Sequence, residues 1–337
     1  FPESAAKHVF ACAQEIRQAC RHIQAGQLAN QFTQIKTGIA LGLFSTYQPA
    51  HIEELPLSMA SGPAVGQALR ALQLAGPNDI VCDNNVVHAW RRLNADVATT
   101  RSSEGFHLVS PQHETRPVPS PEPEPADTPG LQERNEIKLL TILYIEYCLD
   151  TPEQMQAGWL NERFTRLDTL SRTHNASLIG ACQTLKGLRV QLAVGHLKSE
   201  LNDVELAVQL ATQVQSRTTR SAIGYGHAWQ GRYGGKQLKL FNAHGGEVNL
   251  AARVLEKSAQ GHIHLTEQAS QQLNDALPLI ELAEVPIKGE ADPVRTFRIP
   301  LPHEVNHQRE LQHNALHGRS HELEQVLGQI GRASCRE

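Results

Sequence analysis

The 337-residue sequence has no apolar run long enough to cross a membrane. Its longest candidate, LLTILYIEYCL at residues 139–149, has the length of a buried strand. Lys and Arg together number 31 and Asp and Glu 35, so the net charge of -4 gives no global reason to expect a nucleic-acid partner. A signal-peptide pattern is also absent. We therefore expect a cytoplasmic protein that binds neither membrane nor nucleic acid.

Cysteine and histidine motifs are missing as well. The six cysteines are scattered, with no CxxC pair and no zinc-type spacing, which argues against a disulfide framework or a structural zinc site. The 17 histidines form no HExxH or other ligand pattern. The sequence therefore predicts a reduced protein without a histidine-based metal site.

Proline is concentrated in one segment, TRPVPSPEPEPADTPG, which favours extended conformations and cannot build a core. It predicts a first unit at residues 1–110, a linker at 111–132 and a second unit at 133–302. A further segment follows at 303–329, and the final residues 330–337, IGRASCRE, resemble a translated sequencing adapter. Because the chain begins at Phe1 inside a helical pattern, we expect its first unit to be incomplete.

The two units repeat each other. GPAVGQALRALQLAGPNDIVCD at residues 62–83 aligns without gaps, at an offset of 183, with GGEVNLAARVLEKSAQGHIHLT at 245–266. Upstream, KTGIALG at 36–42 corresponds to SAIGYG at 221–226. Two copies, rather than the longer series of a solenoid, indicate a pseudo-dimer with a site between its halves.

Hydrophobic periodicity predicts mixed α and β structure in the second unit. The expected strands are 139–147, 176–185, 189–194, 221–230, 238–241 and 261–265, and the expected helices are 153–174, 204–218, 246–258 and 267–273. Alternation of strands with amphipathic helices predicts an α+β or α/β sandwich.

The stretch HGGEVNLAARVLEKSAQGHIHLTEQ carries the clearest candidate site. Asn249 and Arg253 are four residues apart, so they share one face of the expected helix. Gly245 and Gly246 would let a phosphate approach the helix N-terminus, where free amides favour an anion. An ordinary buried helix with a glycine start, a polar cap residue and one solvated arginine explains the same pattern, so the pattern alone leaves both interpretations open.

Several motifs in order resemble class III adenylate and guanylate cyclase domains. IGYGHAWQGRYGG precedes GGEVNLAAR, which is similar to the GDxVNxAAR pattern of that family, and VPIKGEADPVRTFRI follows. The resemblance covers residues 139–299 and, in part, 3–108. It implies an α+β, ferredoxin-like βαββαβ sandwich whose two copies form an intramolecular pseudo-dimer, in the tandem arrangement of the soluble adenylyl cyclase type.

The resemblance also implies roles for single residues. A nucleoside triphosphate would bind between the copies, with two aspartates of one copy holding two Mg²⁺ or Mn²⁺ ions. The other copy would supply an asparagine that orients the ribose and an arginine that stabilises the transition state, and these match Asn249 and Arg253. The purine-recognising positions carry Thr184 and Asn242, which leaves the choice between ATP and GTP open.

The departures from the family pattern are equally informative. The first metal position carries Glu146 and the second carries Leu188, which cannot ligate magnesium. In the first copy, Gly66 replaces the asparagine while Arg70 keeps the arginine. The pattern indicates a split arrangement in which the second copy supplies Asn249 and Arg253, the first copy's metal ligands lie upstream of residue 1, and the mirrored site is degenerate.

Three interpretations remain open from the sequence: that both copies are purely structural, or that they have one of two functions. The first is a cyclase that converts ATP, with GTP as the other substrate considered, to a 3′,5′-cyclic nucleotide and pyrophosphate in intracellular signalling. The second is a catalytically inactive cyclase-like module that controls a downstream signalling ATPase, because LHGRSHELEQVL at 316–327 resembles the start of such a module. We expect residues 1–329 alone to form little or no cyclic nucleotide.

Overall fold

The structure is a computed structural model that describes residues 8–18, 35–47, 59–92, 99–109, 135–151, 154–234, 239–273, 277–284, 286 and 292–300. The predicted linker at 111–132, the ATPase-like segment at 303–329 and the adapter-like end at 330–337 lie outside these residues. Residues 8–18 are helical, within the expected N-terminal helix. Among the described helices, none combines the length and the apolar character needed to cross a membrane.

The second unit is built around one mixed sheet. Its elements are β7 (Glu136–Cys148), α4 (Ala157–Thr173), β8 (Ala176–Thr184), β9 (Gly187–Val194), α5 (Asp203–Val214), β10 (Thr219–Gly234), β11 (Lys239–His244), α6 (Gly246–Lys257), β12 (Ile263–Thr266), α7 (Glu267–Gln271), β13 (Ile280–Glu281) and β14 (Thr296–Arg298). The strands β10, β7, β9 and β8 are neighbours in that order and pair antiparallel. With α4 and α5 between them, they give the expected α+β, βαββαβ core.

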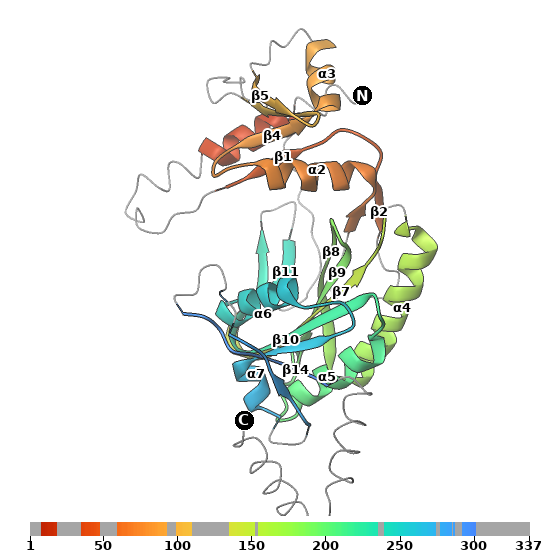
Figure 1. Ribbon diagram of the computed structural model, residues 1–337, viewed down its shortest axis with the longest axis vertical. Helices are drawn as coiled ribbons and strands as arrows, with labels where there is room; N and C mark the ends of the chain where they lie inside the picture. Colours follow the sequence, from red (N-terminus) through yellow and green to blue (C-terminus); the bar gives the residue numbers. More distant parts are fainter. Residues whose placement is uncertain are drawn as a thin grey trace, which may run out of the picture.

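Strand β7 is the centre of this core because its apolar run is buried on both faces. Leu143 and Ile145 pack with residues of α4 and α5, whereas Leu140 and Ile142 pack with residues of α6. The helices therefore cover both faces of the sheet (Figure 1). Most predicted bounds differ from the observed ones by a few residues. Helix α5 ends at Val214 rather than at residue 218, because the backbone at Gln215 is already extended.

The first unit contains β1 (Thr37–Ile39), β2 (Ser45–Tyr47), β3 (Met59–Ser61), α2 (Pro63–Leu74), β4 (Ile80–Asp83), α3 (Asn84–Arg92), β5 (Thr99–Ser103) and β6 (Phe106–Val109). Its four-stranded order, β1-β4-β6-β5, is that of β10-β12-β14-β13 in the second unit. The first residues of α2 and α6, like those of β4 and β12, are 183 positions apart. The repeated sequence thus forms repeated structure.

The two units touch through the β2–β3 hairpin and helix α2. The Tyr47 hydroxyl donates a hydrogen bond to Asn161 Oδ1 at 2.6 Å, and its ring stacks on Phe164 with centroids 5.1 Å apart. Met59 is 3% exposed and belongs to the main core cluster of the second unit. Figure 1 shows α2 beyond the ends of β8 and β9, and residues of α2 contact β8.

His264 on β12 makes stability depend on pH. The side chain is 8% exposed, and burial, with the charges of His262 and Arg298, lowers its pKa from 6.5 to about 4. The imidazole of His264 binds a proton more readily in the unfolded chain than in the folded one. Stability is therefore lost as the pH falls from the unfolded-state pKa of His264 toward its folded-state pKa. We expect His264→Gln to reduce that acid-dependent loss by about 1 to 3 kcal/mol, measured by urea unfolding at pH 7.5 and pH 5. An equal loss in both proteins would contradict this assignment.

Candidate functional site

Helix α6 lies close to the sheet because its start is glycine. A Cβ on Gly245 would lie 2.9 Å from the His227 carbonyl oxygen and 3.2 Å from the Ala228 Cα, so a larger residue would push the helix off β10. A Cβ on Gly246 would meet nothing within 4 Å, which leaves open space beside the first turn. The N-cap residue, Gly245, has no side chain that could accept hydrogen bonds from the N-terminal amides. The helix start therefore leaves room for an anion.

Asn249 and Arg253 lie one turn apart on this helix, off its apolar face. The buried face consists of Val248, Leu250, Ala251, Val254 and Leu255. Asn249 is exposed and Arg253 is half-buried. Asn242 on β11 is half-buried, and its Oδ1 accepts a hydrogen bond from the Ala243 amide at 2.7 Å. The helix thus carries an amide and a guanidinium off its apolar face, about one and two turns beyond its N-terminus.

Glu146, at the first predicted metal position, is closed in by two arginines. Arg189 on β9 and Arg220 on β10 lie directly opposite it in the strand register, one on each side. Its Oε2 accepts hydrogen bonds from Arg220 Nε, at 2.7 Å, and from Arg220 Nη2. Its Oε1 accepts from Arg189 Nε at 3.3 Å and from the Thr184 hydroxyl at 3.0 Å. Both carboxylate oxygens are therefore occupied.

The surroundings keep this buried carboxylate charged. Burial raises the pKa of Glu146, but the nearby guanidinium charges and the hydrogen bonds from Arg220 and Thr184 lower it more, so the pKa lies below its usual value. The predicted purine contact of Thr184 stays a prediction. Here its hydroxyl shapes the β8–β9 turn by accepting hydrogen bonds from the amides of Lys186 and Gly187 at 3.1 and 3.2 Å.

These residues do not fit a divalent metal. Leu188 is fully buried in the apolar core, opposite Tyr147 on β7. Mg²⁺ requires oxygen ligands in octahedral geometry, and Glu146 has no free oxygen to offer. In the parts of the chain that the structure describes, no group of three or more His, Cys, Asp or Glu could hold a metal ion. Among the described residues, Glu146 and Leu188 therefore do not form the metal-binding pair that their positions would require.

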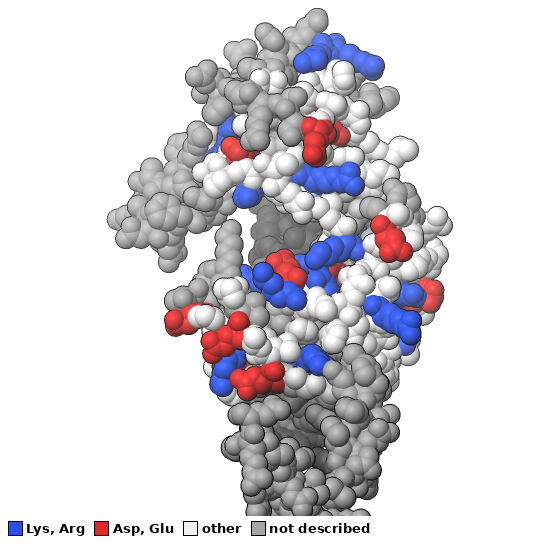
Figure 2. All heavy atoms as spheres, viewed as in Figure 1, with Lys and Arg blue, Asp and Glu red and all other residues white. Residues whose placement is uncertain are grey.

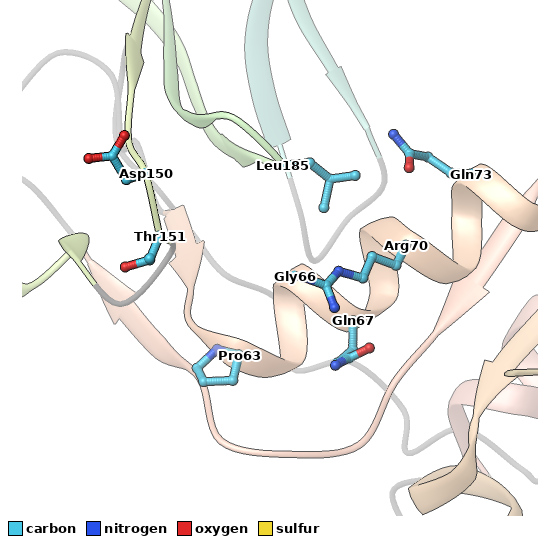
Figure 3. Close-up of a pocket in the computed structure, with 8 residues that line it drawn as sticks. All are labelled: Pro63, Gly66, Gln67, Arg70, Gln73, Asp150, Thr151 and Leu185. Atoms are coloured by element: carbon cyan, nitrogen blue, oxygen red, sulfur yellow. The ribbon is translucent and has the colours of Figure 1, made fainter. Parts of the chain in front are cut away.

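The first-copy counterparts of Asn249 and Arg253 lie beside a cavity between the units. The cavity has a volume of about 590 Å³ and is lined by Pro63, Gly66, Gln67, Arg70 and Gln73 of α2, with Asp150, Thr151 and Leu185 of the second unit. Figure 3 shows Leu185 and Asp150 across the cavity from α2. The structure thus brings the Gly66/Arg70 helix to the same end of the sheet as Glu146 and Leu188.

A buried glutamine of the second unit binds the start of α2. Gln183 is 4% exposed; its Oε1 accepts a hydrogen bond from the Gly62 amide at 2.8 Å, and its Nε2 donates to the Gly62 carbonyl at 3.4 Å. Gly62 has φ 130°, which a residue with a Cβ rarely adopts. A Cβ on Gly66 would lie 3.6 Å from Gln183 Nε2. A Cβ at position 66 would therefore be in ordinary van der Waals contact with Gln183.

Sequence reasoning missed Gln183, Arg189 and Arg220. One signal was available for the arginines, because a lone carboxylate inside an apolar strand needs a buried partner. Figure 2 adds that basic and acidic side chains are intermixed over the face shown, so no single-sign patch marks a site there.

No family model and no curated protein matches this sequence. Solved structures of adenylyl and guanylyl cyclase domains are similar to it. The adenylyl cyclase CyaB from P. aeruginosa is 18% identical, with a TM-score of 0.42 over 50% of this chain and 96% of that one. The guanylate cyclase domain of RhGC from Catenaria anguillulae, in complex with GTP, is 16% identical, with a TM-score of 0.42 over 49% and 98%. At such identities and TM-scores these structures assign neither substrate nor residue roles to this chain.

Proposed function

We propose that this chain is a nucleotidyl cyclase module whose helix α6 supplies half of a nucleoside triphosphate site. The amide of Asn249 orients the ribose, and the N-terminal amides of α6 favour a phosphate. The guanidinium of Arg253 stabilises the charge that develops on the phosphates as the cyclic nucleotide forms and pyrophosphate leaves. ATP is the proposed substrate. GTP is the alternative, because the amide of Asn242 can both donate and accept hydrogen bonds and so fits either purine.

One observation carries this proposal: the asparagine position is exposed in one copy and buried in the other. Asn249 is exposed beside the unfilled space at Gly246. Gly66, its counterpart, is buried under Gln183. A nucleotide can therefore reach Asn249 on α6, whereas the equivalent position on α2, Gly66, is buried.

The proposal includes an intramolecular pseudo-dimer of residues 1–110 and 133–302. The contacts of Tyr47, Met59 and Gln183 between the units support it. With α2 set against the second unit's strand ends, a two-fold relation would set α6 against the corresponding ends of the first unit. Any metal-binding carboxylates would be needed there, because Glu146 and Leu188 do not fit a metal.

A second candidate function is a catalytically inactive regulatory module, and the arginine-bound Glu146 favours it. Such a module would bind a triphosphate on α6 without turnover and act on a downstream ATPase, proposed for residues from 303 onward. The two candidates differ in whether the natural protein forms cyclic nucleotide, while both require α6 to bind a triphosphate.

Binding of a fluorescent ATP analogue tests the shared requirement. We expect Asn249→Ala to raise the dissociation constant by about 10-fold, the effect of losing one hydrogen bond of about 1 to 1.5 kcal/mol. Gln67→Ala, on the cavity side of α2, is the matched control and should leave the dissociation constant unchanged. Weaker binding in the control alone would place the nucleotide in the cavity beside α2 and refute the proposal.

A further inference from the structure

The arginines around Glu146 also reach helix α6. Arg220 is 4% exposed, and its Nη1 donates hydrogen bonds to the carbonyl oxygens of Glu256 at 3.2 Å and Ser258 at 3.0 Å. The more exposed Arg189 only approaches the Glu256 carboxylate, at 3.7 Å. Arg220 therefore connects the carboxylate on β7 with the last turn of the helix that carries Asn249 and Arg253.

This connection gives the end of helix α6 both hydrogen-bond donors and a positive charge. The last four carbonyl groups of an α-helix have no partner within the helix, and their partial negative charge favours a cation. Helix α6 ends at Lys257 with Ser258 as its C-cap, so both carbonyls bound by Arg220 belong to this group. Glu146 in turn holds the guanidinium through two of its nitrogens. One buried side chain thus fixes the helix end against β7.

We propose that Arg220 is a positioning residue that, held by Glu146, fixes helix α6 and with it the direction of Asn249 and Arg253. Glu146, the carboxylate at the degenerate metal position, then supports the helix that is proposed to bind the nucleotide. Naming Asn249 and Arg253 as the groups positioned rests on the proposed function. The anchoring of α6 itself rests only on the contacts of Arg220.

Hydrogen exchange measured without nucleotide tests the anchor. In Arg220→Met, we expect amides of α6 (Gly246–Lys257) to exchange roughly 10-fold faster or more, because the helix end loses its donors and opens locally. Arg220→Lys should show a smaller increase, since an ammonium keeps the charge but cannot span the same acceptors. The control is Arg172→Met, whose ion pair with Asp168 lies on α4 with the arginine 70% exposed. It should leave α6 unchanged.

Affinity for the fluorescent ATP analogue then separates positioning from stability. For variants that circular dichroism shows to be folded at the assay temperature, Arg220→Lys should weaken binding by roughly 3- to 10-fold, and Arg172→Met should not weaken it. If Arg220→Met does not fold, Arg220→Lys and Glu146→Gln carry both measurements.

The outcomes are distinct. Unchanged exchange in α6 overturns the anchor, and so does an increase in Arg220→Lys that is spread equally over α5. Faster exchange in α6 with wild-type affinity overturns the positioning role. If the wild-type chain binds no triphosphate but the Arg220 variants loosen α6, the proposed function fails and the anchor is supported.

Discussion

Replacing Arg253 by alanine should lower cyclic nucleotide formation by the natural protein by about 10²- to 10³-fold. The guanidinium is proposed to meet charge that grows on the phosphates only as the ring closes, so turnover should fall more than substrate affinity. Rates of cyclic product formation and Michaelis constants, measured together, check this. A loss confined to the Michaelis constant would make Arg253 a binding residue with no special role in the transition state.

The chain contains its own control for this variant. Arg70 lies at the equivalent position of α2, 183 residues earlier, and lines the cavity between the units. Arg70→Ala removes the same side chain from the same turn of a repeated helix, and we expect turnover within about 2-fold of wild type because such exposed residues make little energetic contribution. Equal losses in both variants would indicate two equivalent sites and contradict the division of roles between the copies.

Replacing Arg220 by methionine should reduce the free energy of unfolding by about 3 to 5 kcal/mol. Glu146 is fully buried and Arg220 is 4% exposed, so the variant leaves a buried carboxylate without its main partner. Arg189 and Thr184 compensate only at the other oxygen. Urea unfolding at pH 7 measures the loss.

The double variant Glu146→Leu/Arg220→Met tests whether the unpaired charge or the lost contacts to α6 cause this loss of stability. Removing both charged groups should restore a large part of the lost stability, because apolar residues of similar volume often replace a buried ion pair at little cost. In the single variant Arg220→Met, the pKa of Glu146 should rise, so part of the loss should disappear as the pH is lowered and the carboxyl is neutralised. A double variant no more stable than Arg220→Met would mean that the contacts to α6, rather than the unpaired charge, account for the loss.

Much of the fold follows from local sequence. The apolar run of β7 predicted a buried strand, and the ungapped repeat predicted that α2 and β4 would reappear as α6 and β12. Helix ends were less predictable, because a helical pattern such as that after Val214 gives no sharp signal for where the backbone turns extended.

The chemistry at Glu146 could not be predicted in the same way. Its partners Arg189 and Arg220 are separated from it by 43 and 74 residues, and only the strand register brings them opposite the carboxylate. From the sequence alone, Glu146 appeared as a lengthened metal ligand. Once the register is known, two arginines beside one buried carboxylate explain why no metal is needed to balance its charge.

The central claim is that α6, and not α2, receives the nucleotide. Photo-crosslinking with an azido-purine triphosphate, followed by peptide mapping, tests it most directly. We expect the label on peptides of β11 and α6, residues 239–257, and we expect unlabelled nucleotide to compete it away. Specific labelling of α2 or of the β8–β9 turn around Leu185, with α6 unlabelled, would contradict the account.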